Sequence, residues 1–294
     1  MTNQSSQKES DVELFAGHKQ NVKQINFSEF EYIHEELDLK GYSVLPNLIS
    51  ESEIQDLKSD IDELLCQEQN KFGADNLVTM NDHGVVRSPF LSSAAVRKQC
   101  FNKTVLSVLD QVFGDQCVLH VNRAVVSDSQ HRHPAAIWHR EPPYVDFTAS
   151  RPLALTFVHL VDKSSAENGG LTLLPGSHRW NEFPSDQYVK NNAILPEIPA
   201  GSVLVFNSSV FHRGTENHSE NARHSLVSVF TVPVIKQQIN IPVMMRDCGK
   251  EGIADEIPNG RFLLGFQTEL RNSDEEYRQK KMVNTGKINT QVEY

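Results

Sequence analysis

The first part of the chain, residues 25–114, has apolar positions at the spacing of amphipathic helices. Apolar residues recur every three or four positions between residues 27 and 39 and again between 50 and 65. The second stretch opens with Ser50 and a glutamate three residues later, which is the spacing of a capping box. A third helix is predicted over 95–113, and the short run YSVLP between the first two predicts a strand.

Beyond Gly114 the apolar residues come in short runs that are rich in Val, Leu, Phe and Thr. The runs are VLHVNRAVV, LALTFVHLV, LTLLP, SVLVFN and LVSVFTV. Turn-forming residues separate them, including Asn-Gly-Gly at 168–170, Pro-Gly-Ser at 175–177 and Ala-Gly-Ser at 200–202. This alternation predicts an antiparallel sandwich or barrel, so the fold class is mainly β with flanking helices.

The domain organisation follows from these changes of pattern. Residues 1–24 are polar and lack periodic apolar positions, which predicts a flexible polar tail. Residues 25–294 are expected to form a single domain, made of a helical part at 25–114, a β core at 115–235 and a C-terminal segment at 236–294. Gly249, Gly252 and Gly260 in the last segment allow hinge motion, so both a lid over the core and an ordinary surface loop fit it.

Composition and charge exclude several classes of protein. The chain has 294 residues, of which 38% are hydrophobic and 22% charged, so it can bury a core and remain soluble. A net charge of -10 opposes binding to a phosphate backbone, and no nucleic-acid partner is expected. The polar amino terminus predicts neither a signal peptide nor a membrane span, so the expected location is cytoplasmic. The four cysteines form no Cys-x-x-Cys motif and are expected to be reduced thiols, while oligomeric state is left open.

A His-x-Glu pattern occurs three times, at 34–36, 139–141 and 218–220, and only the middle copy has the context of a metal site. The first copy falls on a predicted helix and the last in a polar turn. His139 and Glu141 instead follow an apolar Ile-Trp pair and precede Pro-Pro, which ends strand pairing. Metal ligands of a β scaffold are expected at such a strand end.

A third ligand has to come from elsewhere, and His212 is the strongest candidate because it ends an apolar strand run and precedes Arg-Gly. Together with His139 and Glu141 it would complete the two-histidine, one-carboxylate facial triad of non-haem Fe(II) oxygenases. Arg223 follows eleven residues later at the start of another strand, where its guanidinium could clamp a carboxylate in bidentate fashion.

These motifs resemble the phytanoyl-CoA dioxygenase-like branch of the Fe(II)/2-oxoglutarate oxygenases. The similar segments are GYSVLPNLISESEI, WHREPPY, FVHLVDKSSAENGGLTLLPGSH, AGSVLVFN and HRGTENHSENAR. The most specific are ENGGL with PGSH and the eleven-residue spacing from histidine to arginine. The resemblance implies a double-stranded β-helix, that is, a cupin-like jelly-roll core.

The resemblance also implies the site and its cofactors. His139, Glu141 and His212 would bind Fe(II), and Arg223 would hold the distal carboxylate of 2-oxoglutarate. Ser225 would share that carboxylate, and two strand residues that would line the same pocket are Asn122 and Thr156. The family usually has aspartate where this chain has Glu141, so the carboxylate here is one methylene longer.

The implied activity is that of a 2-oxoglutarate-dependent dioxygenase that uses O2, hydroxylates an unactivated C–H bond of a small metabolite, and releases succinate and CO2. Anionic compounds are among the candidate substrates because several arginines could lie near the mouth of the site. They are Arg87, Arg123, Arg140, Arg246 and Arg261. Glu141 disfavours halogenation, because related halogenating enzymes lack the carboxylate and bind a halide at its coordination position.

Three alternatives stay open. The same fold could perform desaturation or ring formation, or a zinc-dependent or cofactor-independent reaction. It could also be a non-catalytic module that binds a small ligand or a metal.

Overall fold

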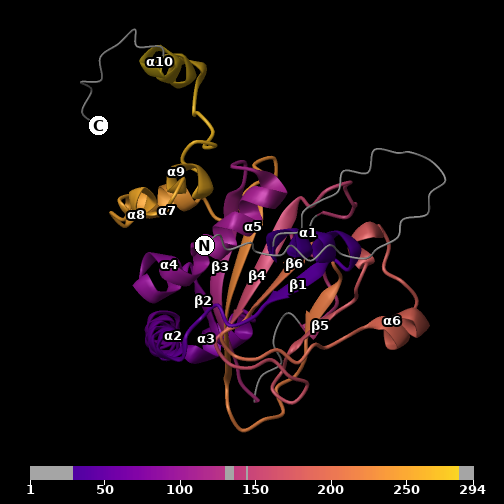
Figure 1. Cartoon of the computed structure of the whole chain (residues 1–294). Coiled ribbons are helices and arrows are strands. Elements are labelled where there is room, and N and C mark those ends of the chain that lie inside the picture. The colour runs from indigo at the N-terminus through magenta and orange to yellow at the C-terminus, as the bar shows by residue number, and fades with distance from the viewer. Residues whose placement is uncertain (1–28, 130–135, 144, 285–294) are drawn as a thin grey trace, which may run out of the picture.

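The computed structural model describes residues 29–129, 136–143 and 145–284 (Figure 1). The predicted polar tail at residues 1–24 lies outside these ranges. Within them, no helix is long and apolar enough to cross a membrane.

A six-stranded antiparallel sheet forms the centre of the molecule, with the strand order β1-β6-β4-β8-β3-β2. In that order the strands are β1 (Tyr42–Leu45), β6 (Val203–Asn207), β4 (Ala154–Leu160), β8 (Arg223–Thr231), β3 (Val118–Ser127) and β2 (Val85–Arg87). A two-stranded antiparallel sheet of β5 (Leu171–Leu173) and β7 (His212–Gly214) lies on one side of it (Figure 1). Isolated bridges such as the one between His139 and His212 extend this smaller sheet.

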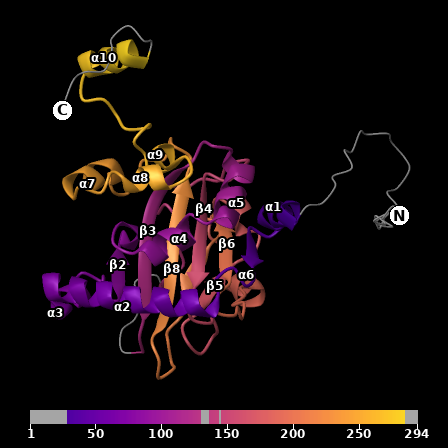
Figure 2. The same ribbon diagram turned by 60° about the vertical axis from the view of Figure 1, so that its left-hand side comes forward.

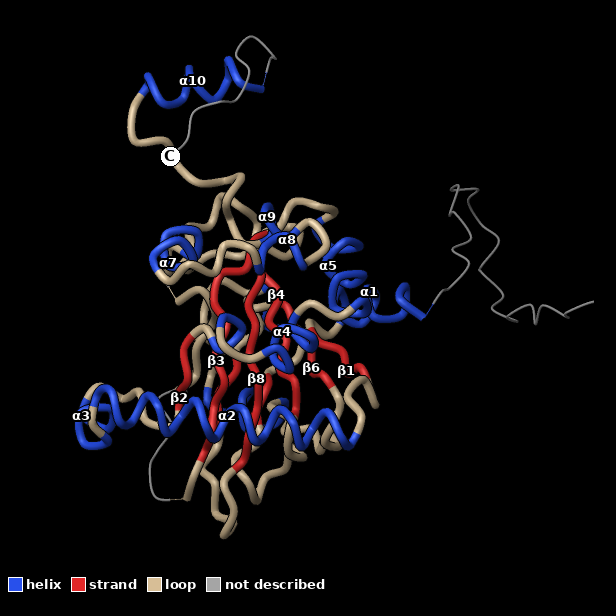
Figure 3. The backbone as a smooth tube through the Cα atoms, turned by 90° about the vertical axis from the view of Figure 1, so that its left-hand side faces the viewer, coloured by secondary structure: helices blue, strands red, loops and turns tan. Residues whose placement is uncertain are grey.

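Helices cover the opposite face of the large sheet, and α2 crosses the strands there (Figure 3). The helices before the β core are α1 (Glu29–Leu39), α2 (Glu51–Phe72), α3 (Ala74–Thr79), α4 (Ala94–Cys100) and α5 (Lys103–Phe113). Helix α2 begins where the sequence predicts, since the Glu53 carboxylate accepts a hydrogen bond from the Ser50 backbone N–H at 2.8 Å. Two short 3₁₀ turns lie at Pro89–Leu91 and Ser177–Arg179.

The single helix predicted over 95–113 is wrong, because the segment forms two helices. Phe101 and Asn102 interrupt it, and the Asn102 side chain accepts a hydrogen bond from the Val105 backbone N–H at 2.9 Å. Asparagine is a strong N-cap, so it starts α5 in a new direction while the apolar spacing continues on both sides.

The later helices lie around the ends of the sheet. Helix α6 (Asp186–Asn192) follows β5, and α7 (Ile241–Asp247), α8 (Ile253–Glu256) and α9 (Gly260–Leu263) gather at one end of the strands (Figure 2). Helix α10 (Asp274–Asn284) stands away from the rest in the same view. The C-terminal segment is therefore mainly helical.

The main core lies between the large sheet and its helices. Phe157 of β4 and Phe230 of β8 pack edge to face with ring centroids 5.8 Å apart, and Phe101 contacts Phe230 at 6.3 Å. Burial of each such ring contributes about 1.5–3 kcal/mol to folding. This packing fixes the sheet whose other face carries the candidate site.

Candidate metal centre

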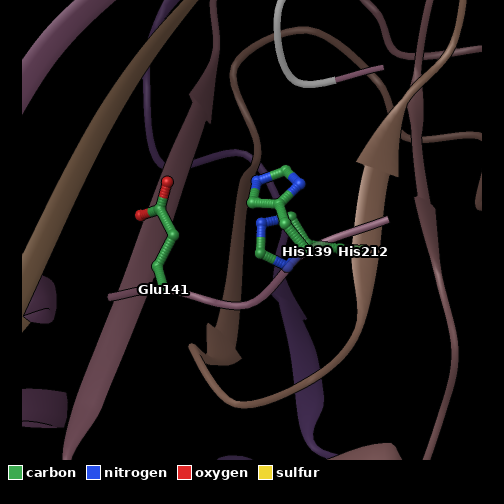
Figure 4. Close-up of side chains that lie close together, drawn as sticks. All are labelled: His139, Glu141 and His212. Atoms are coloured by element: carbon green, nitrogen blue, oxygen red, sulfur yellow. The ribbon is translucent and has the colours of Figure 1, made fainter. Parts of the chain in front are cut away.

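The structure brings His139, Glu141 and His212 together although 73 positions separate the first from the last along the chain. One potential ligand atom from each residue lies within 4.8 Å of the others. Figure 4 shows the two imidazoles close together with the Glu141 carboxylate beside them. Backbone hydrogen bonds hold this arrangement: His139 and His212 exchange two at 3.0 Å, and the Glu141 N–H donates to the Ser208 carbonyl at 2.9 Å.

Both histidines are oriented by their own backbone. His139 Nδ1 lies 2.8 Å from the Ile137 carbonyl oxygen, and His212 Nδ1 lies 2.9 Å from that of Val210. The Nδ1–H group therefore donates in each case, which leaves Nε2 as the free lone pair. Burial, with a smaller contribution from the neighbouring His139, lowers the pKa of His212 to about 4, so its ring is neutral as a metal ligand requires.

The third member of the group, Glu141, is held by Arg123 of β3. An Arg123 terminal nitrogen lies 2.5 Å from Glu141 Oε1, and only 12% of the Glu141 side chain is exposed. Burial opposes ionisation of this carboxyl, but the Arg123 guanidinium and the two imidazoles hold its pKa below the ordinary value. Glu141 is therefore a carboxylate at neutral pH.

These three residues fit a divalent transition metal. Two neutral imidazole nitrogens and one carboxylate are the donor set of the facial triad, which leaves coordination positions for other ligands. The fixed Nδ1–H bonds of both rings also match the outer contacts that metal-binding histidines normally make.

A narrow cavity of about 70 Å³ joins the three residues to Arg223. Thr156, Ser225 and Arg223, three of the residues predicted to bind 2-oxoglutarate, all line it. Arg223 is 9% exposed, and its Nε donates to the Asn168 carbonyl at 3.1 Å. Burial lowers its pKa to about 10, which still leaves the guanidinium charged at neutral pH.

The prediction for Asn122 is wrong. Its side chain faces the helices, where Nδ2 lies 3.1 Å from the Ser228 hydroxyl oxygen and 3.2 Å from the Cys100 sulfur. The reason is the alternation of β3, in which Arg123 faces the cavities and its neighbour Asn122 must face the other way. The sequence of β3 does not alternate clearly between polar and apolar residues, so it did not show which face carries Asn122.

A larger cavity of about 400 Å³ lies beside His139 and Glu141, and two of the predicted substrate arginines border it. Arg123 is the partner of Glu141, and Arg87 forms a two-pronged ion pair with Asp82 at 2.6 and 2.8 Å. Both guanidinium groups therefore already have a carboxylate partner.

The structure gives Arg140 a further role beside its place at the larger cavity. The residue borders the larger cavity, but its guanidinium packs on the Phe211 ring and donates to the backbone carbonyls of Ser177 and Trp180. One terminal nitrogen of this guanidinium holds the 3₁₀ turn at Ser177–Arg179, whereas Nε has no hydrogen-bond partner among the described residues.

Arg246 and Arg261 lie on the C-terminal helices and border neither cavity. Arg246 pairs with Glu269, and Arg261 pairs with Asp255 at 2.7 Å. The expectation that Arg261 contacts substrate is therefore also wrong, because these are surface ion pairs of the helical end.

One network near Arg223 was missed from the sequence. His224 hydrogen-bonds Asp162 through Nδ1 at 2.8 Å and Asp62 of α2 through Nε2 at 2.9 Å, and Lys58 pairs with Asp162 at 2.6 Å. Burial opposes the charged imidazole, but the two carboxylates raise the pKa of His224 above its ordinary value. The network ties α2 to the strand end that carries Arg223, and its four residues come from three segments too far apart in sequence to form a motif.

Comparisons with known proteins agree with this architecture. The crystal structure of EctD from S. alaskensis with 2-oxoglutarate and 5-hydroxyectoine matches with a TM-score of 0.59 and 21% identity, covering 75% of this chain and 82% of that one. The crystal structure of the epimerase SnoN in complex with Fe3+, alpha ketoglutarate and nogalamycin RO matches with a TM-score of 0.56 and 15% identity, covering 71% and 87%. The predicted cupin-like jelly-roll with flanking helices is confirmed.

Sequence comparison gives the family. The uncharacterized protein Rv1501 of Mycobacterium tuberculosis (strain ATCC 25618 / H37Rv) is 22% identical over 261 residues, which cover 88% of this chain and 94% of that protein. A family model described as phytanoyl-CoA dioxygenase (PhyH) matches residues 37–225, well over half of the chain. This protein belongs to the phytanoyl-CoA dioxygenase family.

Proposed function

We propose that this protein is an Fe(II)- and 2-oxoglutarate-dependent dioxygenase that hydroxylates a C–H bond of a small molecule. The observation that carries the proposal is that the His139, Glu141 and His212 cluster lines the same narrow cavity as a buried arginine, Arg223. The three metal ligands alone do not require a buried arginine nearby. A keto acid that chelates the metal and has a second carboxylate requires a cation to bind that carboxylate.

The site residues would have two separate roles, binding the metal and binding 2-oxoglutarate. His139, Glu141 and His212 would hold Fe(II), and Arg223 with Ser225 would bind the distal carboxylate of 2-oxoglutarate. With both bound, the centre supplies oxidation of a substrate C–H bond by O2, with succinate and CO2 as products. The protein orients the two histidines through their Nδ1–H groups and excludes water with the apolar walls of the narrow cavity.

We assign the two organic molecules to separate cavities. The narrow cavity, which Arg223 lines, would hold 2-oxoglutarate. The larger cavity of about 400 Å³ also reaches His139 and Glu141 and has room for a small substrate. A molecule bound there would lie next to the metal without displacing the keto acid.

The proposal is tested by mixing the anaerobic protein with Fe(II) and 2-oxoglutarate. A visible charge-transfer absorption of the chelated keto acid is expected for the wild type and is expected to vanish in His139→Ala. His218→Ala, which changes the exposed histidine of another His-x-Glu sequence, is the matched control and should keep the absorption. Absence of the absorption in the wild type would leave only a non-catalytic ligand-binding module or another metal chemistry.

Turnover is then measured as succinate formed from 2-oxoglutarate with a library of small metabolites. Hydroxylation predicts a product heavier by one oxygen atom, whereas desaturation, ring formation or epimerisation would consume 2-oxoglutarate without adding oxygen. Glu141→Ala should abolish succinate formation and Glu141→Asp should retain part of it, because aspartate keeps the carboxylate ligand. Normal turnover in Glu141→Ala would mean that the carboxylate is not a ligand.

A further inference from the structure

His120 lies at an irregularity of β3 that turns its side chain toward the larger cavity. In the pairing of β3 with β8, Leu119 is opposite Phe230 and Val121 is opposite Val229, so His120 is the extra residue of a β-bulge. Such bulges re-aim side chains and occur often beside functional sites.

The faces of the strand confirm this effect. Ala124 packs with the helices in the main core, and Leu119 does so too although an odd number of positions separates the two. A regular strand would place them on opposite faces. The bulge restores Leu119 to the core, and His120 consequently borders the larger cavity together with Val121 and Arg123.

His120 is buried, and no described residue hydrogen-bonds its ring. It is 4% exposed, and neither ring nitrogen makes a hydrogen bond within the part of the chain that the structure describes. Nδ1 is sealed from solvent, so Nε2, which is not, is the ring atom that a ligand in the cavity can reach. Buried polar side chains are nearly always paired, so an unpaired one at the wall of a cavity indicates a place where a ligand supplies the partner. The bulge directs this unpaired ring toward the cavity.

The charges around the cavity narrow the chemistry of that ligand. Arg123 and Arg87 are neutralised by Glu141 and Asp82, so neither offers an unpaired cation to a substrate anion. Burial lowers the pKa of His120, partly opposed by the Glu141 charge, so its ring is neutral and provides one donor and one acceptor. Nε2 is the donor or the acceptor according to the tautomer, and an uncharged hydroxyl or carboxamide can meet it in either state because each carries both a donor and an acceptor.

We propose that His120 determines substrate specificity by hydrogen-bonding a hydroxyl or carboxamide group of the substrate in the larger cavity, beside His139 and Glu141. The proposal rests on the proposed function. It names the substrate class as small uncharged alcohols or amides with an apolar body that fits walls such as Val85 and Ile137. Small carboxylates and phosphates are the class it excludes.

The test uses a fixed panel of small alcohols, primary amides and carboxylates matched in size. Each compound is titrated into the anaerobic protein with Fe(II) and 2-oxoglutarate, and binding is followed as a change in the charge-transfer absorption. Alcohols or amides should bind to the wild type, and His120→Leu should weaken the best of them by at least about tenfold. His120→Asn, which keeps a donor and an acceptor, should retain more affinity than His120→Leu.

Two further readouts separate recognition from a structural role. His120→Leu should leave the affinities for Fe(II) and 2-oxoglutarate within about twofold, and it should raise the Tm of the ligand-free protein by about 2 °C or more, because it removes an unpaired buried polar group. A histidine that merely supported the fold would lower the Tm when replaced.

The outcomes separate the two proposals. If the absorption never forms, the proposed function fails, and the Tm of His120→Leu still tests whether the ring is an unpaired cavity residue. If the absorption forms but only carboxylates bind, if no panel alcohol or amide binds, or if His120→Leu binds them like the wild type, the inference about His120 is overturned.

Discussion

Arg223→Lys separates the shape of the guanidinium from its charge. Arg223 reaches the narrow cavity from the start of β8, and its Nε is fixed by the Asn168 carbonyl at 3.1 Å. The two terminal nitrogens can then face a carboxylate as a pair. Lysine keeps a positive charge, but it presents a single ammonium group and cannot make the paired contact.

The expected loss follows from one missing hydrogen bond. A hydrogen bond to a charged group contributes about 1.5–3 kcal/mol, which corresponds to about 10- to 150-fold in affinity for 2-oxoglutarate. Arg223→Met also removes the charge and should lose more. Fe(II) affinity should change little in either variant, because Arg223 is outside the group of potential ligand atoms.

The assay is an anaerobic titration of 2-oxoglutarate into Fe(II)-loaded protein, followed by charge-transfer absorption. Circular dichroism of each variant controls for folding, and a second titration with a keto acid that lacks the distal carboxylate provides the chemical control. That shorter acid should bind the wild type and Arg223→Lys alike. If Arg223→Lys binds 2-oxoglutarate within twofold of the wild type, the distal carboxylate is held elsewhere and the assignment is refuted.

Three further changes test the fold. Gly84→Ala should lower the free energy of unfolding by about 2 kcal/mol or more in urea titrations, since Gly84 has a φ of 66° and a Cβ would lie 2.1 Å from a backbone carbonyl of β3; a loss under about 0.5 kcal/mol would contradict this. In the native protein a thiol reagent should label the exposed Cys66 and Cys248 promptly. Cys100 and Cys117 are buried, and burial raises the pKa of each thiol to about 12, so they should be labelled only on unfolding. Labelling of all four cysteines at one rate would contradict this prediction. The pKa of His224 is raised in the folded protein, so its ion pairs stabilise the fold fully below about pH 6.5 and lose this effect as pH rises through the raised pKa. The decrease in Tm caused by His224→Gln should therefore be larger at pH 6 than at pH 9. An equal decrease at both pH values would show that the charge of the ring is not involved.

The strands were predictable because their apolar runs are short and end at turn residues. Each of the five runs named from the sequence overlaps a strand of the structure, and so does the run at residues 42–46. The three-residue strands β2 and β7 were not predicted because neither lies in one of these apolar runs, whereas the equally short β5 does. His212 was expected at the end of a long run and instead begins β7 after Ser208–Phe211 have broken that run.

The candidate ligands were predictable for a chemical reason, whereas the arginines were not. His139, Glu141 and His212 can form a metal site only in a few contexts, and the apolar run beside each restricts the choice. An arginine fits a substrate pocket, a surface ion pair or a structural contact equally well. Arg140 and Arg261 differ from Arg123 only in their partners in space, which a single sequence does not contain.

Strand β3 connects the two findings that the motifs did not reveal. Position 123 carries the guanidinium that holds Glu141, and the bulge at position 120 aims a second polar ring at the same cavity. Both side chains lie on one face because the bulge changes the alternation between Leu119 and Val121. A shorter aspartate at position 141 would withdraw its carboxylate from Arg123 by about one bond length, roughly 1.5 Å, so the glutamate and the arginine of β3 depend on each other. The strand that positions the carboxylate therefore also forms the wall against which we expect the substrate to bind.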